Sequence, residues 1–162
     1  LKGYDKFSPT RIILDKNLDI KLKSYIFKST KKGNTILFYN SLNIAKYKVL
    51  KKKGVTLIKT KLNNEGLLDL KIVLRKLFTL GTRTLLVEGG DKISKNLIKN
   101  RLIDTFYLFQ SPKILRVNKI NQGFTSLGIL NGKYKKVSKM TSRTTRDNIT
   151  IYKRKTVSPS AI

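Results

Sequence analysis

The sequence contains no cysteine and no histidine in 162 residues, and only nine of its side chains are acidic. These two absences exclude disulfides, thiol nucleophiles, imidazole bases and the usual zinc sites. Because the nine carboxylates are spread along the chain, we also expect no carboxylate metal site. Any chemistry must therefore rely on a bound cofactor, on a few carboxylates or on lysine.

Long apolar runs are absent as well. No continuous apolar stretch approaches 18 residues, so we expect neither a membrane span nor a membrane partner. The first six residues lack the apolar core of a secretory signal, and the chain does not begin with methionine. We interpret Leu1 as a trimmed or mid-protein start.

Positive charge is in large excess. The chain has 36 Lys and Arg against 9 Asp and Glu, a formal net charge of +27. Such a chain attracts phosphate, in nucleic acid or in a small ligand. However, the lysines are scattered, and the chain is rich in Lys, Asn and Ile, which AT-rich codons encode. Biased base composition and phosphate binding both stay open as explanations of the charge.

The spacing of apolar residues predicts strands that alternate with helices. Strands are expected at 11–14, 35–39, 55–58, 84–87 and 105–110, with two late antiparallel strands at 134–139 and 148–153. Helices are expected at 42–53, 69–80 and 92–99, the second with Leu70, Val73, Leu74, Leu77 and Phe78 facing inward. This alternation predicts an α/β fold with a mainly parallel central sheet flanked by helices. We expect residues 1–155 to form one domain and 156–162 a tail.

The segment from Leu85 to Ser94 is expected to carry the chemistry, because it combines a strand, a diglycine and a helix start. A helix N-terminus offers unpaired N–H groups and a partial positive charge to an anion. Gly89 and Gly90 would let the backbone approach a pyrophosphate, with Asp91 as the helix N-cap. Glu88 is placed to accept hydrogen bonds from sugar hydroxyls, and Lys92, Ser94 and Lys95 could donate to phosphate. A diglycine after a strand is more often a plain turn, and the segment lacks the G-x-G-x-x-G fingerprint.

Six short motifs, taken in order, carry a resemblance to a known family. They are Pro9-Thr10-Arg11-Ile12-Ile13-Leu14-Asp15, Gly54-Val55, Asp69-Leu70, Leu86-Val87-Glu88-Gly89-Gly90, Leu102-Ile103-Asp104 and Ser111-Pro112-Lys113-Ile114-Leu115. In this order and spacing they resemble the reductase domain of the bifunctional riboflavin-biosynthesis deaminase–reductase, from about Pro9 to Lys153.

The resemblance implies a dihydrofolate-reductase-like fold, NADPH as hydride donor and 5-amino-6-(5-phosphoribosylamino)uracil as substrate. It implies that Glu88 contacts the substrate. It implies that cofactor phosphates are held by the helix start, here Gly90, Asp91, Lys92, Ile93, Ser94, Lys95 and Asn96. It also places Asp15 near the cofactor, although an aspartate after a strand is at least as often a turn former. A cytoplasmic location and a homodimer that pairs through residues 102–115 are expected with it.

The chain also departs from the family pattern. The N-terminal strand with a Ser-Leu-Asp-Gly type motif, the later Asp-x-Pro segment and the deaminase half are not in this sequence, so we expect an incomplete site. Arg116 stands where the family often has glycine, and Asp91 where it has a small residue or proline. Alternatives stay open: a basic nucleic-acid-binding protein, a non-catalytic remnant that only dimerises, or another NADP-binding reductase of the same fold. For the reductase, we expect nucleic acid to bind only nonspecifically, through charge.

Overall fold

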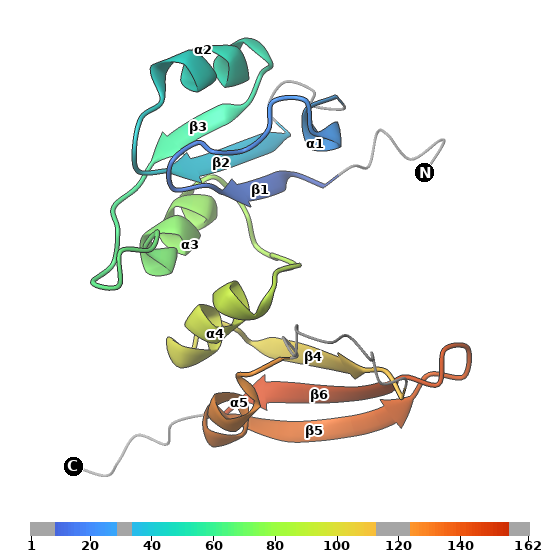
Figure 1. The fold of residues 1–162 in the computed structure, drawn as a ribbon. Helices are drawn as coiled ribbons and strands as arrows, with labels where there is room; N and C mark the ends of the chain where they lie inside the picture. The colour runs from blue at the N-terminus through green and yellow to red at the C-terminus, as the bar shows by residue number, and fades with distance from the viewer. Residues whose placement is uncertain (1–8, 29–33, 113–123, 156–162) are drawn as a thin grey trace, which may run out of the picture. The chain divides into compact units, whose positions relative to one another are not determined.

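The computed structural model describes residues 9–28, 34–112 and 124–155, in two compact units, Leu1–Thr84 and Leu85–Ile162 (Figure 1). The first unit contains β1 (Arg11–Leu14), α1 (Tyr25–Lys28), β2 (Thr35–Tyr39), α2 (Ile44–Lys52), β3 (Thr56–Lys59) and α3 (Leu70–Thr79). The second contains α4 (Asp91–Lys99), β4 (Thr105–Gln110), α5 (Leu127–Lys133), β5 (Tyr134–Thr141) and β6 (Asn148–Arg154).

The first unit is a parallel sheet of order β1-β2-β3 with helices on both faces (Figure 1). Every residue of the central strand β2 is buried, and its side chains alternate between two apolar cores. On one face Leu37 packs with Leu50 of α2. On the other, Phe38 packs with Val73 and Leu77 of α3. For this unit, the prediction of a parallel sheet flanked by helices is confirmed.

Helix α3 begins and ends where the sequence signals predict. The side chain of Asp69 caps it by accepting hydrogen bonds from the N–H groups of Lys71 and Ile72, and Gly81 follows its last turn at φ +89°. One prediction about this helix is wrong: Phe78 does not face inward but is 62 % exposed. The guanidinium of Arg83 lies 4.5 Å from the centre of its ring, so the ring is covered by a cation instead of by the core.

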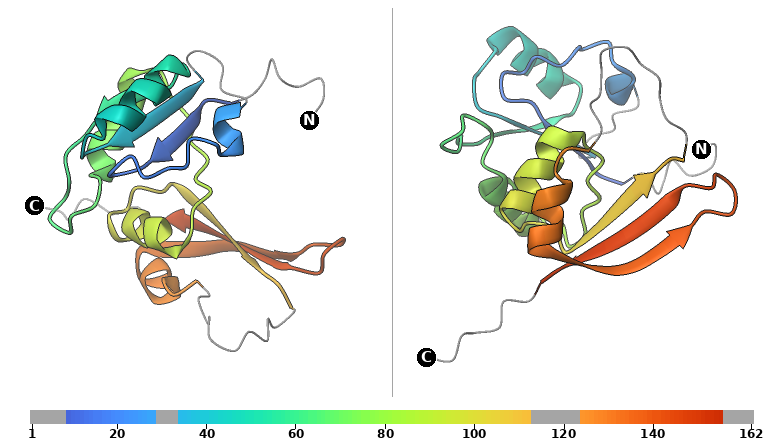
Figure 2. Two further views of the ribbon diagram at one scale, coloured as in Figure 1. Left: turned by 45° about the horizontal axis from the view of Figure 1, so that its top comes forward. Right: turned by 60° about the horizontal axis from the view of Figure 1, so that its bottom comes forward.

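The second unit is an antiparallel sheet of order β4-β6-β5 with α4 and α5 side by side over one face (Figures 1 and 2). Leu108 and Tyr152 of the sheet pack there with Ile98 of α4 and Leu130 of α5. The strand pairing puts a second set of side chains on the opposite face, which we call the outer face: Tyr107, Phe109, Ser138, Met140, Ile149 and Ile151, with Thr105, Lys135 and Lys153 at one end of it.

The predicted strand at 84–87 is not formed. The segment has no regular secondary structure, and Leu85, Leu86 and Val87 are 37 %, 79 % and 41 % exposed. A strand needs a hydrogen-bonded neighbour, and no described residue pairs with this segment. Its apolar composition therefore predicts burial, but the described residues do not cover it.

Candidate functional site

The candidate site is the junction between Glu88 and the first turn of α4. The helix begins at Asp91, and its N-cap is Gly90, at φ −72° and ψ 179°, so the prediction that Asp91 is the N-cap is wrong. Gly90 offers no side chain, and no side-chain hydrogen bond caps the helix. The N–H groups of the first turn are therefore left without a side-chain acceptor, as an anion-binding helix end requires.

The two glycines of the junction differ in what their missing side chains leave room for. A Cβ on Gly89 would lie 2.1 Å from Cγ2 of Ile93, a methyl group fixed close to the helix backbone. A Cβ on Gly90 would meet no atom within 4 Å. Gly89 is therefore required by the packing of the chain itself, whereas the space beside Gly90 is open to a ligand.

Asp91 turns its carboxylate to the segment before α5. Its Oδ1 accepts hydrogen bonds from the Thr125 N–H at 3.1 Å and the Ser126 hydroxyl at 3.1 Å, and its Oδ2 accepts one from the Thr125 hydroxyl at 2.5 Å. The bond from the Thr125 hydroxyl, aided by the other two and by the charge of Lys95, holds the pKa of Asp91 below its ordinary value against partial desolvation. The carboxylate is therefore ionised at neutral pH, and three of its roughly four acceptor sites are occupied.

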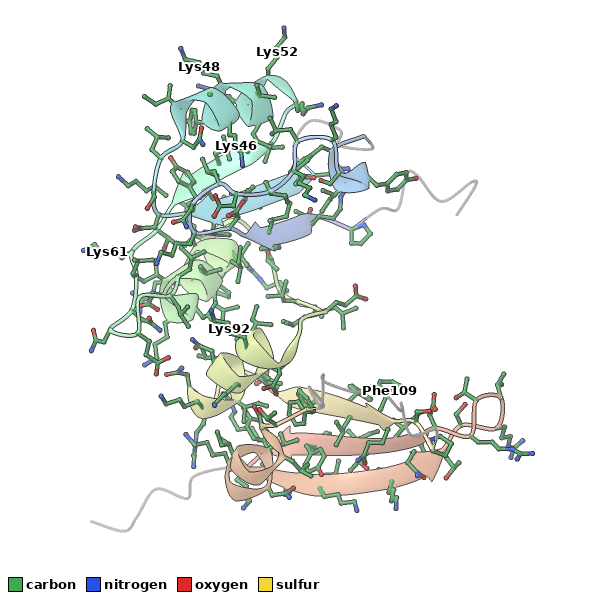
Figure 3. All side chains as sticks on the ribbon, viewed as in Figure 1. Lys46, Lys48, Lys52, Lys61, Lys92 and Phe109 are labelled. Carbon is green, nitrogen blue, oxygen red and sulfur yellow. The ribbon has the colours of Figure 1, made fainter. Side chains whose placement is uncertain are left out.

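The remaining predicted residues of α4 differ in exposure. Lys92 and Lys95 are exposed, Ile93 and Ser94 are half-buried, and Asn96 is buried (Lys92 is labelled in Figure 3). The side-chain oxygen of Asn96 accepts a hydrogen bond from Asn100 at 3.0 Å, and this occupies it within the helix. The two exposed cations thus lie on the first two turns of α4, where they add positive charge to the helix end.

Glu88 lies three residues before Asp91, the first residue of α4, and is exposed. It makes no hydrogen bond or ion pair with any residue that the structure describes. Its carboxylate is therefore free to accept hydrogen bonds from a ligand.

Asp15, the predicted residue of the first unit, organises a turn. Its two carboxylate oxygens accept hydrogen bonds from the N–H groups of Asp19 at 2.9 Å and Ile20 at 2.8 Å. These bonds shape the chain directly after β1, at the carboxyl end of the parallel sheet. The turn-forming role weighed from the sequence is thus present in the structure, and a role beside the cofactor stays a prediction.

The chemistry of this junction fits a phosphate or diphosphate group. An uncapped helix start, open space beside Gly90 and two exposed lysines supply N–H donors, room and positive charge. Within residues 9–28, 34–112 and 124–155, no three acidic side chains are grouped so as to hold a metal ion. No helix in those ranges has the length and apolar character needed to cross a bilayer.

Sequence reasoning missed Thr125 and Ser126, the partners of Asp91. A local signal was available, because Thr-Ser before the apolar residues Leu127, Ile129 and Leu130 is typical of a helix start, and Ser126 is indeed the N-cap position of α5. No local signal could have paired them with Asp91, which lies 34 residues earlier in the chain.

Solved structures with the same architecture show which fold this chain has. The chain matches a RibD structure from Acinetobacter baumannii with a TM-score of 0.66 at 18 % identity, covering 91 % of this chain and 38 % of that one. It matches a pyrimidine reductase-like protein from Corynebacterium diphtheriae with a TM-score of 0.67 at 17 % identity, covering 97 % and 68 %. The fold is therefore the dihydrofolate-reductase-like α/β fold that the motifs implied.

The family model for the RibD C-terminal domain matches residues 2–149. The chain belongs to this family. A riboflavin biosynthesis protein RibD from Aquifex aeolicus is 35 % identical over 107 residues, and one from Actinobacillus pleuropneumoniae is 24 % identical over 107 residues. Each alignment covers 66 % of this chain but only 28 % of the relative, so the chain spans well under half the length of these proteins.

Proposed function

We propose that this chain is the cofactor-binding part of a cytoplasmic reductase of riboflavin biosynthesis. The substrate would be 5-amino-6-(5-phosphoribosylamino)uracil and the reductant NADPH. The observation that carries the proposal is the uncapped start of α4 behind Gly90, in a chain of the RibD C-terminal domain family. The cytoplasmic location rests on the biosynthetic role of that family alone.

The residues of the junction would divide the work of binding. The N–H groups at the start of α4 would hold the cofactor diphosphate, and Lys92 and Lys95 would neutralise its charge. The free carboxylate of Glu88 would accept hydrogen bonds from the sugar of the substrate. Asp15 would shape the chain near the cofactor through its turn, and Asn96 would act only through packing.

No side chain of this site needs to form a covalent bond. NADPH, when bound, supplies the hydride. The chain would contribute by holding the nicotinamide and the substrate carbon close and aligned. Such alignment can lower the activation free energy of a reaction by up to about 7–11 kcal/mol. A site without histidine and cysteine is adequate for this task.

The test measures the binding of NADPH to the full chain by fluorescence. The salt concentration is about 0.3 M, at which attraction between exposed charges is screened. NADH and ATP are the controls. Saturable binding that favours NADPH supports the proposal. Equal binding of all three that disappears with salt means that a cation-rich chain attracts anions, and the proposal fails.

A prediction concerns Glu88. The variant Glu88→Gln keeps the shape of the side chain and removes its charge. We expect it to weaken binding of the phosphorylated pyrimidine about tenfold, because a hydrogen bond to a charged acceptor contributes about 1.5–3 kcal/mol. The affinity for NADPH should change by less than about twofold. Titration with each ligand separately measures both. An equal loss for the two ligands would make Glu88 structural.

We propose also that two copies pair through the outer face of the antiparallel sheet. Tyr107, Phe109 and Met140 are 56 %, 64 % and 47 % exposed, and together with Ile149 and Ile151 they form an apolar surface built from all three strands. An isologous pair would bury this surface against its own copy. The predicted pairing segment 102–115 overlaps this face through β4, and residues 113–115 lie outside the described ranges.

A further inference from the structure

Three hydrogen bonds join the first residue of α4 to the segment that precedes α5. We call them the Asp91 tether: Thr125 N–H to Oδ1, the Thr125 hydroxyl to Oδ2 and the Ser126 hydroxyl to Oδ1. They link residues 34 and 35 positions apart in the sequence. All hydrogen bonds that the structure gives to this carboxylate run to these two residues, and none runs to the N–H groups of α4 itself.

An untethered aspartate at this position would oppose a phosphate. The first turn of a helix carries partial positive charge, so a free carboxylate there is drawn to the same N–H groups that an anion would use. It would also repel the anion directly, by about 1 kcal/mol at 4 Å even in water.

The partner hydroxyls are committed to this arrangement. Ser126 occupies the N-cap position of α5 and is 1 % exposed, yet it makes no cap hydrogen bond to its own helix. Its hydroxyl donates to Asp91 instead. The chain thus gives up a side-chain cap on α5 and keeps the carboxylate of Asp91 engaged.

We propose that Asp91 is a positioning residue whose carboxylate Thr125 and Ser126 keep away from the anion-binding N–H groups of α4. The tether fixes the start of α4 against the start of α5 and leaves the helix end open to the cofactor diphosphate. This inference rests on the proposed cofactor site.

If Asp91 is a positioning residue, the NADPH affinities of its variants should follow an unusual order. Thr125→Val with Ser126→Ala removes the two hydroxyl donors, so the charged carboxylate keeps only the hydrogen bond from the Thr125 N–H and is held more loosely beside the site. We expect this double variant to bind NADPH about five- to tenfold more weakly, the ratio that about 1–1.4 kcal/mol of repulsion gives. Asp91→Ala alone removes the carboxylate and should weaken binding less. Adding Asp91→Ala to the double variant should restore most of the lost affinity.

A purely structural tether predicts a different order. Asp91→Ala and the double variant would then lose the same stability and the same affinity, and the triple variant would be no better than either. Recovery by the triple variant therefore decides between the two roles, and it also shows that the variant chain folds. Thr141→Val is the matched control, because it removes a threonine hydroxyl of β5 that donates to Asn148 of β6 in the same unit.

The experiment titrates inorganic pyrophosphate as well as NADPH into each variant and follows the backbone amide resonances of Lys92, Ile93 and Ser94. Shifts of these amides that weaken in the double variant and recover in the triple variant support the inference. Pyrophosphate binding in this order without any preference for NADPH would leave the tether intact and overturn the reductase proposal. Absence of amide shifts in the unmodified chain, or no recovery in the triple variant, overturns the inference.

Discussion

Gly89 and Gly90 are adjacent, and their environments give them different tasks. The missing Cβ of Gly89 makes room for Ile93, and the missing Cβ of Gly90 leaves open space at the end of a helix. Neither glycine has a positive φ, so neither is needed for its backbone freedom. A diglycine motif therefore carries one position set by internal packing and one available to a ligand.

A pair of substitutions separates these two tasks. We expect Gly89→Ala to destabilise the chain by about 1–3 kcal/mol, because the methyl group collides with Ile93. We expect Gly90→Ser to keep or raise stability by a few tenths of a kcal/mol (~0.3), because serine caps helices at least as well as glycine. The same serine would occupy the N–H groups at the start of α4 and lower NADPH affinity about tenfold, the loss of about one charged hydrogen bond. Urea unfolding and NADPH titration measure the two effects. If Gly90→Ser binds NADPH normally, the start of α4 does not hold the cofactor.

At the scale of the element, α3 shows how far a periodic pattern reaches. Its caps, Asp69 and Gly81, act within a few residues, so the sequence predicts both ends. Its buried stripe includes Leu70, Val73 and Leu77 but stops before Phe78. Whether the last turn of a helix lies over the sheet depends on where the sheet ends. The spacing of apolar residues along the helix carries no information about that.

Neighbouring residues of α3 should therefore respond differently to the same truncation. Leu77→Ala removes a side chain that is 1 % exposed and packed in the core with Phe38, and we expect a loss of about 2–5 kcal/mol. Phe78→Ala removes a larger side chain that is 62 % exposed, and only its contact with Arg83, about 0.5–1 kcal/mol, should be lost. Urea unfolding of both variants compares them. Equal losses would mean that Phe78 is buried in solution.

At the scale of the whole molecule, the net charge of +27 and the apolar outer face act in opposite directions on self-association. Two copies repel each other at long range, and the repulsion is screened by salt. Burial of the outer face is favourable and is not weakened by salt.

We therefore expect dimerisation to strengthen with salt. Phe109, labelled on β4 in Figure 3, is 64 % exposed on the outer face, and Phe109→Glu should shift the chain to monomer at micromolar concentrations. Tyr25→Glu, at a 78 % exposed aromatic residue of α1, is the matched control and should leave the dimer unchanged. Sedimentation equilibrium at about 0.05 M and 0.5 M salt measures both, salts chosen so that the Debye length differs about threefold. A chain that is monomeric at every salt concentration would contradict the pairing proposal.

The net charge also leads to a prediction about the binding of nucleic acid. Exposed lysines such as Lys48 and Lys52 project from α2 (Figure 3) and offer phosphate contacts without a base-reading element. We expect the affinity for unrelated oligonucleotides to fall at least about a hundredfold between 50 and 200 mM salt, with no preference for sequence. Fluorescence anisotropy measures this. Tight, sequence-selective binding at physiological salt would favour the nucleic-acid-binding alternative over the reductase.

The sequence determined what depends on near neighbours in the chain. β1 and β4 have the predicted bounds, and α2 ends at Lys52, with Gly54 at positive φ two residues later. A helix follows the diglycine as predicted, because the signals for it lie within ten residues. Only the tertiary structure decided which partners these elements meet. Residues 84–87 have no neighbouring strand among the described residues. Asp91 bonds to Thr125 and Ser126 and is not the helix cap. Gly89 is packed against Ile93, whereas Gly90 faces open space. The physical reason is range: caps and periodicity act over a few residues, whereas strand pairing and side-chain contacts join residues far apart in the chain.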